Sequence, residues 1–441
     1  MKSAALGFTI TVLLICALSL ATGAAAQKQQ ATSQPNYLVF ELGTLGGSSG
    51  SGNSMNNLGW VMGNSNLAGD QATNAALWIY GRKFDLGTLG GTNSGVFWPV
   101  HNTNGLISGI AETSIVDPTP ENWSCGYFFP SFTFHTCQGF VWQNGLMTAL
   151  PTLGGNNGYG AGMNNLGQVV GWAENTTVDS TCNFPQVYQF EAVLYTRVHG
   201  QYQAQQLAPY SNDPDGAATA INNPGQVVGI SGLCSNAVGG ASAEHALLWQ
   251  NGVPTDLGNL GGMAWNTPQG INNSGEIVGF SNLSGDENAP LNPHAFLWTP
   301  QTGVMQDLHT LSGDTVSEAV AINDRGQIVG LSCVDNTFSS CRAFLYQNGT
   351  MTDLNSLTSD KQLSLYAAND IDSRGEITGV GIDSSTGEAR AFIAVLGPGS
   401  APSVASTGLD TAKVTISNAV RSQILPKLGL GGIGAAPIKQ K

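Results

Sequence analysis

The chain has 441 residues and carries 15 Lys and Arg against 29 Asp and Glu, a net charge of −14, although only 10% of its residues are charged. With 58 glycines, this low charge density indicates a turn-rich β protein rather than a helical one. No basic cluster is present, so nucleic acid is excluded as an expected partner. The 41% of hydrophobic residues is too high for a disordered chain.

Residues 1–26 have the pattern of a secretory signal peptide. Lys2 is followed by the apolar run "ALGFTITVLLICALSLA", and the small residues Ala24 and Ala26 favour cleavage before Gln27. An uncleaved membrane anchor is the alternative. No later segment is long and apolar enough to span a bilayer. The sequence therefore predicts a secreted protein, extracellular or periplasmic, with no membrane span after cleavage.

After a short linker at 27–35, the segment 36–397 rewrites one motif seven times. Three of the copies are "AINNPGQVVGIS" from Ala220, "GINNSGEIVGFS" from Gly270 and "AINDRGQIVGLS" from Ala321. Each copy follows a "DLGTLGG"-like segment and precedes a variable loop, a strand like "HAFLW" and a short turn with one more strand. Four short strands in a unit of this length have the size of a propeller blade.

Each copy contains the spacing Asn–x–x–Gly, which predicts a tight turn between the first two strands of the unit. The Asn side chain can bond the backbone two residues on, and the Gly takes the left-handed conformation. A second Gly four residues later indicates a bulge or a close backbone approach. We expect structural roles for these turn residues: Asn56, Gly59, Asn102, Gly105, Asn164, Gly167, Asn222, Gly225, Asn272, Gly275, Asn323, Gly326, Asp372 and Gly375.

The two ends of the repeat region are offset by one strand. "NYLVFEL", Asn36–Leu42, matches the fourth strand of a unit but precedes the first unit, whereas the last unit stops after its third strand. Such an offset closes a ring, because the N-terminal strand completes the last blade. The sequence thus predicts an all-β, seven-bladed β-propeller of four-stranded blades. A pair of β-sandwiches is the alternative.

The composition changes at Pro398, where a linker and a basic tail, 398–441, begin. Within the tail, "LDTAKVTISNAVRSQIL" predicts one short amphipathic helix. Two alternatives stay open: an extension without fixed structure, or a helix docked on the propeller or on a partner.

The signal peptide, "DLGTLGG", "INNSGEIVGFS" and "HAFLW" together resemble the HAF-repeat family of extracellular bacterial proteins, over about Asn36–Leu396. The resemblance implies export and a repeat architecture, and it brings no established reaction or catalytic residues. Two units carry the family's histidine, His245 and His294. The remaining units have other residues there, so no histidine chemistry is shared by all blades: Asn74, Gln138, Glu191, Arg342 and Arg390.

Blade topology divides the connections between two faces. The turns between strands a and b and between c and d lie on one face, here called the turn face; the longer b–c and d–a connections lie on the other, the loop face. All six cysteines of the mature chain fall in b–c loops and lack C-x-x-C spacing, so we expect disulfides rather than zinc, with free buried thiols as the alternative. The loop positions predict three pairs: Cys125–Cys137, Cys333–Cys341 and Cys182–Cys234.

Long loops on a rigid scaffold favour binding on the loop face, whereas the turn face presents only short repeated turns. The aromatic candidates are interpreted as a stacking platform, with packing between blades as the alternative. No calcium-loop or HExxH pattern occurs, so no metal or cofactor is expected. The candidate ligand-binding residues are Trp98, Tyr159, Trp265, Tyr366, Asp215, Asp314, Glu318, His245 and His294.

The function predicted from these features is a secreted, non-catalytic binding or interaction scaffold for an extracellular ligand, a glycan or a protein. The first alternative is a secreted polysaccharide hydrolase or lyase with carboxylates at the mouth of the central channel, which needs two carboxylates at a set separation. The second is a purely structural surface protein. The G-x-S-x-G pattern of a hydrolase is absent from the repeats.

Overall fold

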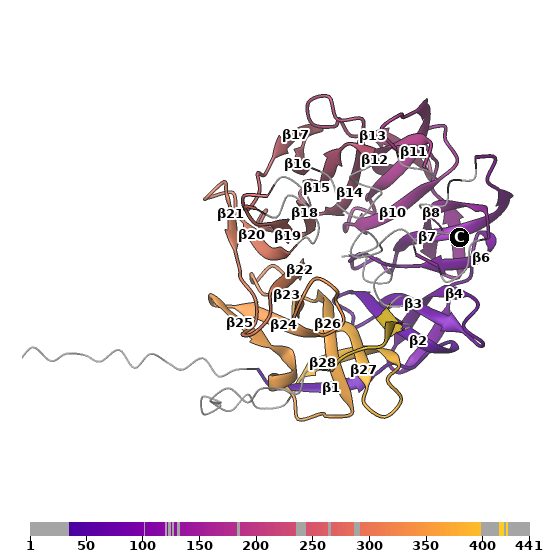
Figure 1. Cartoon of the computed structure of the whole chain (residues 1–441). Coiled ribbons are helices and arrows are strands. Elements are labelled where there is room, and N and C mark those ends of the chain that lie inside the picture. The colour runs from indigo at the N-terminus through magenta and orange to yellow at the C-terminus, as the bar shows by residue number, and fades with distance from the viewer. Residues whose placement is uncertain are drawn as a thin grey trace, which may run out of the picture.

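The strands of the chain form seven four-stranded antiparallel sheets arranged as the blades of a ring (Figure 1). This computed structural model describes residues 35–100, 102–119, 121, 125, 128–129, 133–182, 186–234, 244–262, 266–285, 292–397, 414–418 and 420–421. The predicted seven-bladed β-propeller is confirmed. The predicted signal peptide lies outside the described residues. Within the described part, no helix has the length and apolarity needed to cross a membrane.

The strands of the first three blades are, in chain order, β2 (Gly46–Met55), β3 (Val61–Leu67), β4 (Thr73–Ile79) and β5 (Arg82–Asp85); β6 (Gly90–Gly95), β7 (Ile107–Val116), β8 (His135–Gln143) and β9 (Leu146–Ala149); β10 (Gly158–Met163), β11 (Val169–Val178), β12 (Tyr188–Val198) and β13 (Gln201–Gln206). Blades 4 to 6 are β14 (Asp215–Ile221), β15 (Val227–Gly232), β16 (His245–Gln250) and β17 (Val253–Asp256); β18 (Thr267–Ile271), β19 (Ile277–Asn282), β20 (Pro293–Trp298) and β21 (Met305–Asp307); β22 (Val316–Ile322), β23 (Ile328–Cys333), β24 (Cys341–Gln347) and β25 (Thr350–Asp353). A 3₁₀ turn, η1 (Leu354–Leu357), leads to blade 7, which is β26 (Leu363–Ile371), β27 (Ile377–Asp383), β28 (Ala389–Leu396) and β1 (Tyr37–Glu41).

The ring is closed by the N-terminal strand. β1 pairs antiparallel with β28, from Tyr37 opposite Leu396 to Glu41 opposite Phe392, and supplies the fourth strand of blade 7. The Tyr37 hydroxyl also donates a hydrogen bond to the carbonyl oxygen of Gly375 at 3.0 Å. The strand offset in the sequence therefore has the structural meaning that was expected.

The a–b turns have the predicted chemistry. In blade 1 the Asn56 side-chain oxygen accepts hydrogen bonds from the backbone N–H groups of Leu58 and Trp60 at 3.0 and 3.1 Å. The turn glycines of all seven blades have φ between 69° and 86°, the left-handed region that other residues avoid. The second glycine has a different role: a Cβ at Gly63 would stand 1.9 Å from the carbonyl oxygen of Ser51, and each equivalent glycine meets a strand-a carbonyl in the same way.

The hydrophobic core lies between neighbouring blades rather than in one central mass. One cluster packs Leu77 of blade 1 against Phe140 of blade 2 and continues to Val193 of blade 3. Strands a and b are buried along most of their length, whereas β5 at the outer edge of blade 1 is exposed throughout. The inner strands are thus packed tightly around the axis. The short turns lie at one end of the central channel, and the longer connections lie at the other.

Candidate functional site

The seven a–b turns converge around the axis of the ring and line a pocket of about 80 Å³ on the turn face. A volume of this size holds several water molecules or a small polar group. Its floor is apolar and consists of the last strand-a residue of five blades: Met55, Ile221, Ile271, Ile322 and Ile371. Its rim is polar and consists of turn residues: Asn56, Asn57, Asn102, Thr103, Asn165, Asn222, Asn223, Asn272, Asn273, Asn323, Asp324, Asp372 and Ser373.

In four of the turns, the first Asn also contacts the next blade. The Asn222 side-chain oxygen accepts from the backbone N–H of Gln226 at 2.8 Å, while its Nδ2 donates to the carbonyl oxygen of Asn272 in the next blade at 3.0 Å. Four consecutive blades repeat this second bond, here called the Asn relay: Asn164 to Asn222, Asn222 to Asn272, Asn272 to Asn323 and Asn323 to Asp372. The turn residues therefore connect blade to blade around the pocket.

The second turn residue, for which no role was predicted, points its side chain toward the preceding blade. Five backbone N–H groups donate to these side-chain oxygens, at 2.8 to 3.0 Å: Thr103 to Asn165, Asn165 to Asn223, Asn223 to Asn273, Asn273 to Asp324, and Ser373 to Asn57. The signal was present in the sequence, because every copy has a polar residue at this position.

The rim keeps hydrogen-bonding groups for a ligand. In the described part of the chain, the Nδ2 groups of Asn57, Asn165 and Asn223 donate to no protein atom, because only their oxygens are used. Asp324 adds a carboxylate to the rim, and its two oxygens accept from Asn273 at 2.8 Å each. The pocket thus combines amide donors, an anionic acceptor and an apolar floor.

Trp98 extends across the central channel. Its indole Nε1 donates to the side-chain oxygen of Gln269 at 2.8 Å, and Gln269 lies on β18, on the opposite side of the ring from blade 2 (Figure 1). The Trp98 ring also meets the Tyr159 ring edge to face, with centroids 5.0 Å apart. The ring nitrogen and one edge of the Trp98 indole are therefore used in protein contacts, although the side chain is only partly buried.

Of the other aromatic candidates, Tyr159 and Tyr366 are each only 1% exposed. The Tyr366 hydroxyl donates to the carbonyl oxygen of Phe338 at 2.5 Å. Both rings belong to hydrophobic clusters, so the alternative of packing between blades describes them. Trp265 lies outside the described residues.

The acidic candidates are buried or paired. Asp215 is fully buried, and this burial, followed by the neighbouring Asp179, raises the pKa of its carboxyl to about 9. Glu318 is also fully buried, and burial raises its pKa well above the usual range. Asp314 forms an ion pair with Arg342 at 2.7 Å. These acids do not form a pair of solvent-facing carboxylates.

The two histidines of the "HAFLW"-like segments lie in different blades and each faces an acid. His245 Nδ1 is 2.8 Å from Asp213, and its ring centroid is 4.9 Å from that of Tyr210. His294 Nδ1 is 3.0 Å from Asp307. The structure therefore does not bring them into one site.

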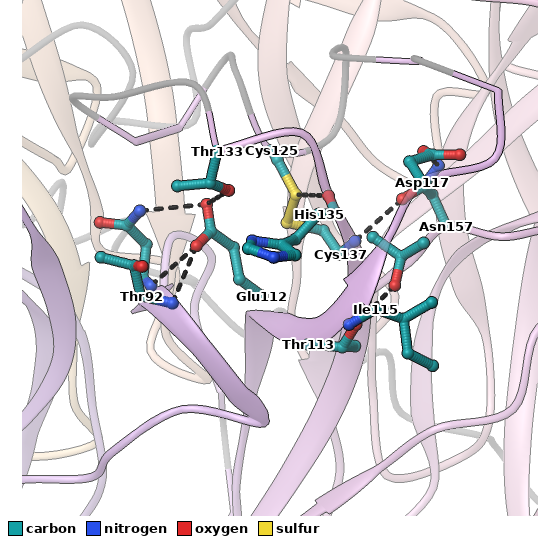
Figure 2. Close-up of a disulfide and its surroundings, with 12 residues drawn as sticks. Thr92, Glu112, Thr113, Ile115, Asp117, Cys125, Thr133, His135, Cys137 and Asn157 are labelled. Carbon is teal, nitrogen blue, oxygen red and sulfur yellow. Dashed lines mark hydrogen bonds between the residues drawn. A yellow bond between two sulfur atoms is a disulfide. The ribbon is translucent and has the colours of Figure 1, made fainter.

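Two buried glutamates, which the sequence analysis did not single out, fasten the d–a connections of blades 2 and 3. The Glu112 carboxylate accepts from the backbone N–H groups of Thr92 and Asn93 and from the Thr133 hydroxyl, as Figure 2 shows. Glu174 holds the next blade in the same way, and burial, followed by the charge of Glu121, raises its pKa to about 7. The shared segments "GIAE" and "GWAE" were a readable signal.

The structure contains the same three disulfides that the loop positions predict: Cys125–Cys137, Cys182–Cys234 and Cys333–Cys341. Hydrogen bonds connect the loops further. Asn157 donates to Asp117 at 2.8 Å beside the first disulfide (Figure 2), and Glu121 accepts from the backbone N–H groups of Val187 and Tyr188 at 2.7 Å. The loops of blades 2 to 4 therefore form one cross-linked layer.

A described part of the C-terminal tail, 414–418 and 420–421, packs on the loop face. Ile416 is buried in a cluster with Phe338 and Tyr366, and its backbone N–H donates to the carbonyl oxygen of Ser339 at 2.9 Å. The tail thus covers part of blades 6 and 7, and the open pocket is on the opposite face.

Comparison with known proteins gives a likeness of fold only. No family model and no curated protein matches the sequence significantly. Among solved structures, a Trypanosoma rangeli sialidase has 9% identity and a TM-score of 0.37, and the match covers 71% of this chain and 55% of that one. A Pyrococcus horikoshii acylaminoacyl peptidase has 9% identity and a TM-score of 0.42, and the match covers 78% of this chain and 50% of that one. The aldose sugar dehydrogenase of Streptomyces coelicolor has 10% identity and a TM-score of 0.34, and the match covers 82% of this chain and 100% of that one. This chain spans about half the length of the first two, and likenesses this low carry no functional argument.

Proposed function

We propose that this chain is an exported, non-catalytic binding scaffold whose ligand enters the axial pocket on the turn face. The observation that carries the proposal is the rim, where the Nδ2 donors of Asn57, Asn165 and Asn223 and the Asp324 carboxylate line one pocket with an apolar floor. The proposed site is on the turn face, whose residues were predicted to be structural. The sequence had predicted binding on the loop face.

Export is supported by the N-terminal pattern, by the resemblance to the HAF-repeat family and by three disulfides, which persist in oxidising compartments. The disulfides and the tail stabilise the loop face, and the Asn relay stabilises the pocket. A preorganised rim reduces the ordering cost of binding.

A binding role fits the acids better than hydrolysis does. A glycosidase places one carboxylic acid and one carboxylate on either side of the scissile bond. Asp215 and Glu318 are fully buried, and Asp314 is neutralised by Arg342. None of these three acids is therefore placed to meet a polysaccharide from solvent.

The chemistry of the rim favours a small polyhydroxyl ligand, such as the end of a glycan chain or a free polyol. Hydroxyl groups both donate and accept, so they match amide donors on one side and a carboxylate on the other. The apolar floor suits the C–H face of a sugar. A pocket of about 80 Å³ admits a small terminal group.

An array of glycans, polyols and cell-wall fragments, run beside a hydrolysis assay on the same compounds, tests the proposal. Asn273→Trp places an indole at the mouth of the pocket, and Ser274→Trp places the same indole at the next exposed residue, which does not line it. We expect binding by the wild type and by Ser274→Trp, loss of binding in Asn273→Trp, and no released product. Product release, or a ligand retained equally by both variants, would overturn the proposal.

A further inference from the structure

Blade 5 brings two histidines and an aspartate together at its outer rim, on the loop face and away from the axial pocket. His294 lies in β20, Asp307 ends β21, and His309 follows two residues later. His294 Nδ1 is 3.1 and 3.0 Å from the two carboxylate oxygens of Asp307, and His309 Nδ1 is 3.1 Å from Oδ2. One ligand atom from each residue lies within 4.8 Å of the other two.

Blade 1 shows what the same positions do without the second histidine. There the Asn74 Nδ2 donates to the Asp85 carboxylate at 2.8 Å, and the backbone N–H of Gly87 donates to the same carboxylate at 2.8 Å. Gly87 has φ 78°. In blade 5, His309 replaces this glycine, keeps the left-handed conformation with φ 60°, and donates its N–H to Asp307 at 2.7 Å.

That replacement is unfavourable for the backbone, because a residue with a Cβ pays strain in the left-handed region that glycine avoids. A strained residue that persists points to a role for its side chain. Beside Asp307 the replacement adds a second imidazole, with its Nδ1 on the carboxylate oxygen that His294 also faces.

We propose that His294, Asp307 and His309 bind a zinc ion, or a similar divalent transition-metal ion, with a fourth position left to water or to a ligand atom. Two imidazole nitrogens and one carboxylate oxygen are donors that zinc takes with three protein ligands. Tetrahedral bonds of zinc place neighbouring donor atoms about 3.3 Å apart. The separations of 3.0 and 3.1 Å between nitrogen and oxygen need little change to reach that value.

The exposure of the three side chains fits an open coordination position. His294 and Asp307 are 15% and 24% exposed and are held by the strands, whereas His309 is 78% exposed and free to adjust its ring. Binding requires each imidazole to present the Nδ1 lone pair and to carry its proton on Nε2. Without metal, the Nδ1 atoms of the two histidines form hydrogen bonds to Asp307 instead. A measurement of metal uptake therefore distinguishes a zinc site from a hydrogen-bonded cluster.

The second group of possible ligand atoms in the described residues does not offer this chemistry. Asp179 and Asp215 lie beside Cys182 and Cys234, but both sulfurs belong to one disulfide and supply no thiolate.

Titration of the untagged full chain with Zn²⁺, after removal of metal with a chelator, tests the proposal. We expect one tightly bound ion per chain. His309→Gly introduces the residue that blade 1 has at this position, and His294→Asn introduces the asparagine that contacts the aspartate there. Both variants should therefore fold. Each should weaken zinc binding at least about tenfold, the smallest loss usual even for residues behind the ligands.

His245→Asn is the matched control, because His245 faces Asp213 in blade 4 without belonging to a group of three possible ligands. It should bind zinc as the wild type does. A wild-type chain that takes up no zinc overturns the proposal. So does zinc affinity that is unchanged in both His309→Gly and His294→Asn, or lost in His245→Asn. Thermal melting of the metal-free variants shows that weakened binding is not unfolding.

Discussion

The indole nitrogen of Trp98 lies 2.8 Å from the side-chain oxygen of Gln269, although the two residues are 171 positions apart and come from blades on opposite sides of the ring. A hydrogen bond across the axis couples blades that share no strand pairing. The stability of the ring should therefore depend on this contact.

Trp98→Ala removes the hydrogen bond and the edge-to-face contact with Tyr159. We expect the free energy of unfolding to fall by about 3 kcal/mol, the low end for a large aromatic residue, because Trp98 is only partly buried. Trp98→Phe keeps most of the packing and should cost about 1 kcal/mol for the lost bond. A double-mutant cycle with Gln269→Met in denaturant unfolding measures the coupling. Additive effects of Trp98→Phe and Gln269→Met would show that the bond contributes nothing.

The Asn relay predicts a cost between blades. Asn222→Asp keeps the side-chain oxygen that accepts from Gln226 but removes the donor to the carbonyl oxygen of Asn272. The free energy of unfolding should fall by about 1 kcal/mol, because the buried carbonyl oxygen of Asn272 loses one of its two donors and keeps the backbone N–H of Gly275. Asn144→Asp, in a c–d turn with left-handed φ, is the control and should stay within about 0.5 kcal/mol. If urea titrations give equal losses of stability for Asn222→Asp and Asn144→Asp, the bond from Asn222 to the next blade contributes nothing.

Much of the fold was readable from the sequence because it depends on local rules repeated seven times. The Asn–x–x–Gly spacing predicted the a–b turns, and the position of Asn36–Leu42 before the first unit predicted the closure of the ring. The cysteine pairs followed from the blade register. The site was not readable in the same way. The approach of Trp98 to Gln269 and the convergence of the second turn residues depend on ring geometry, which no local pattern contains. The exchange of Gly87 for His309 was visible as "DLG" against "DLH", but the position of the imidazole was not.

The disulfide that closes the longer loop should stabilise the chain more, with a logarithmic dependence on loop length. Cys182–Cys234 spans 52 residues and Cys333–Cys341 spans 8. In the chain-entropy model, replacing both cysteines by Ala costs about 4 kcal/mol for the first pair and about 2.5 kcal/mol for the second. Melting of the two double variants under oxidising conditions gives the comparison. A larger loss for Cys333–Cys341 would contradict the entropic account.

The buried Asp215 predicts a pH dependence of stability. Burial, followed by Asp179, raises its pKa from the ordinary value of 3.8 to about 9 in the folded chain. Between these values the folded state holds a proton that the unfolded state has lost, so this group makes stability fall as pH rises. Asp215→Asn imitates the protonated form and removes this dependence. Its melting temperature should gain on the wild type from pH 5 to pH 9. Parallel curves for the two proteins would contradict the raised pKa.

The most direct test of binding at the axial pocket is NMR of the chain labelled with ¹⁵N only at asparagine, titrated with the best ligand from the array. The same label reports both faces: the side-chain amides of Asn57, Asn165 and Asn223 lie at the pocket rim. That of Asn175 lies near the loop-face end of β11, hydrogen-bonded to Gln189. We predict that the rim amides shift with saturation and that Asn175 stays in place. Shifts at Asn175 with silent rim amides would contradict the account.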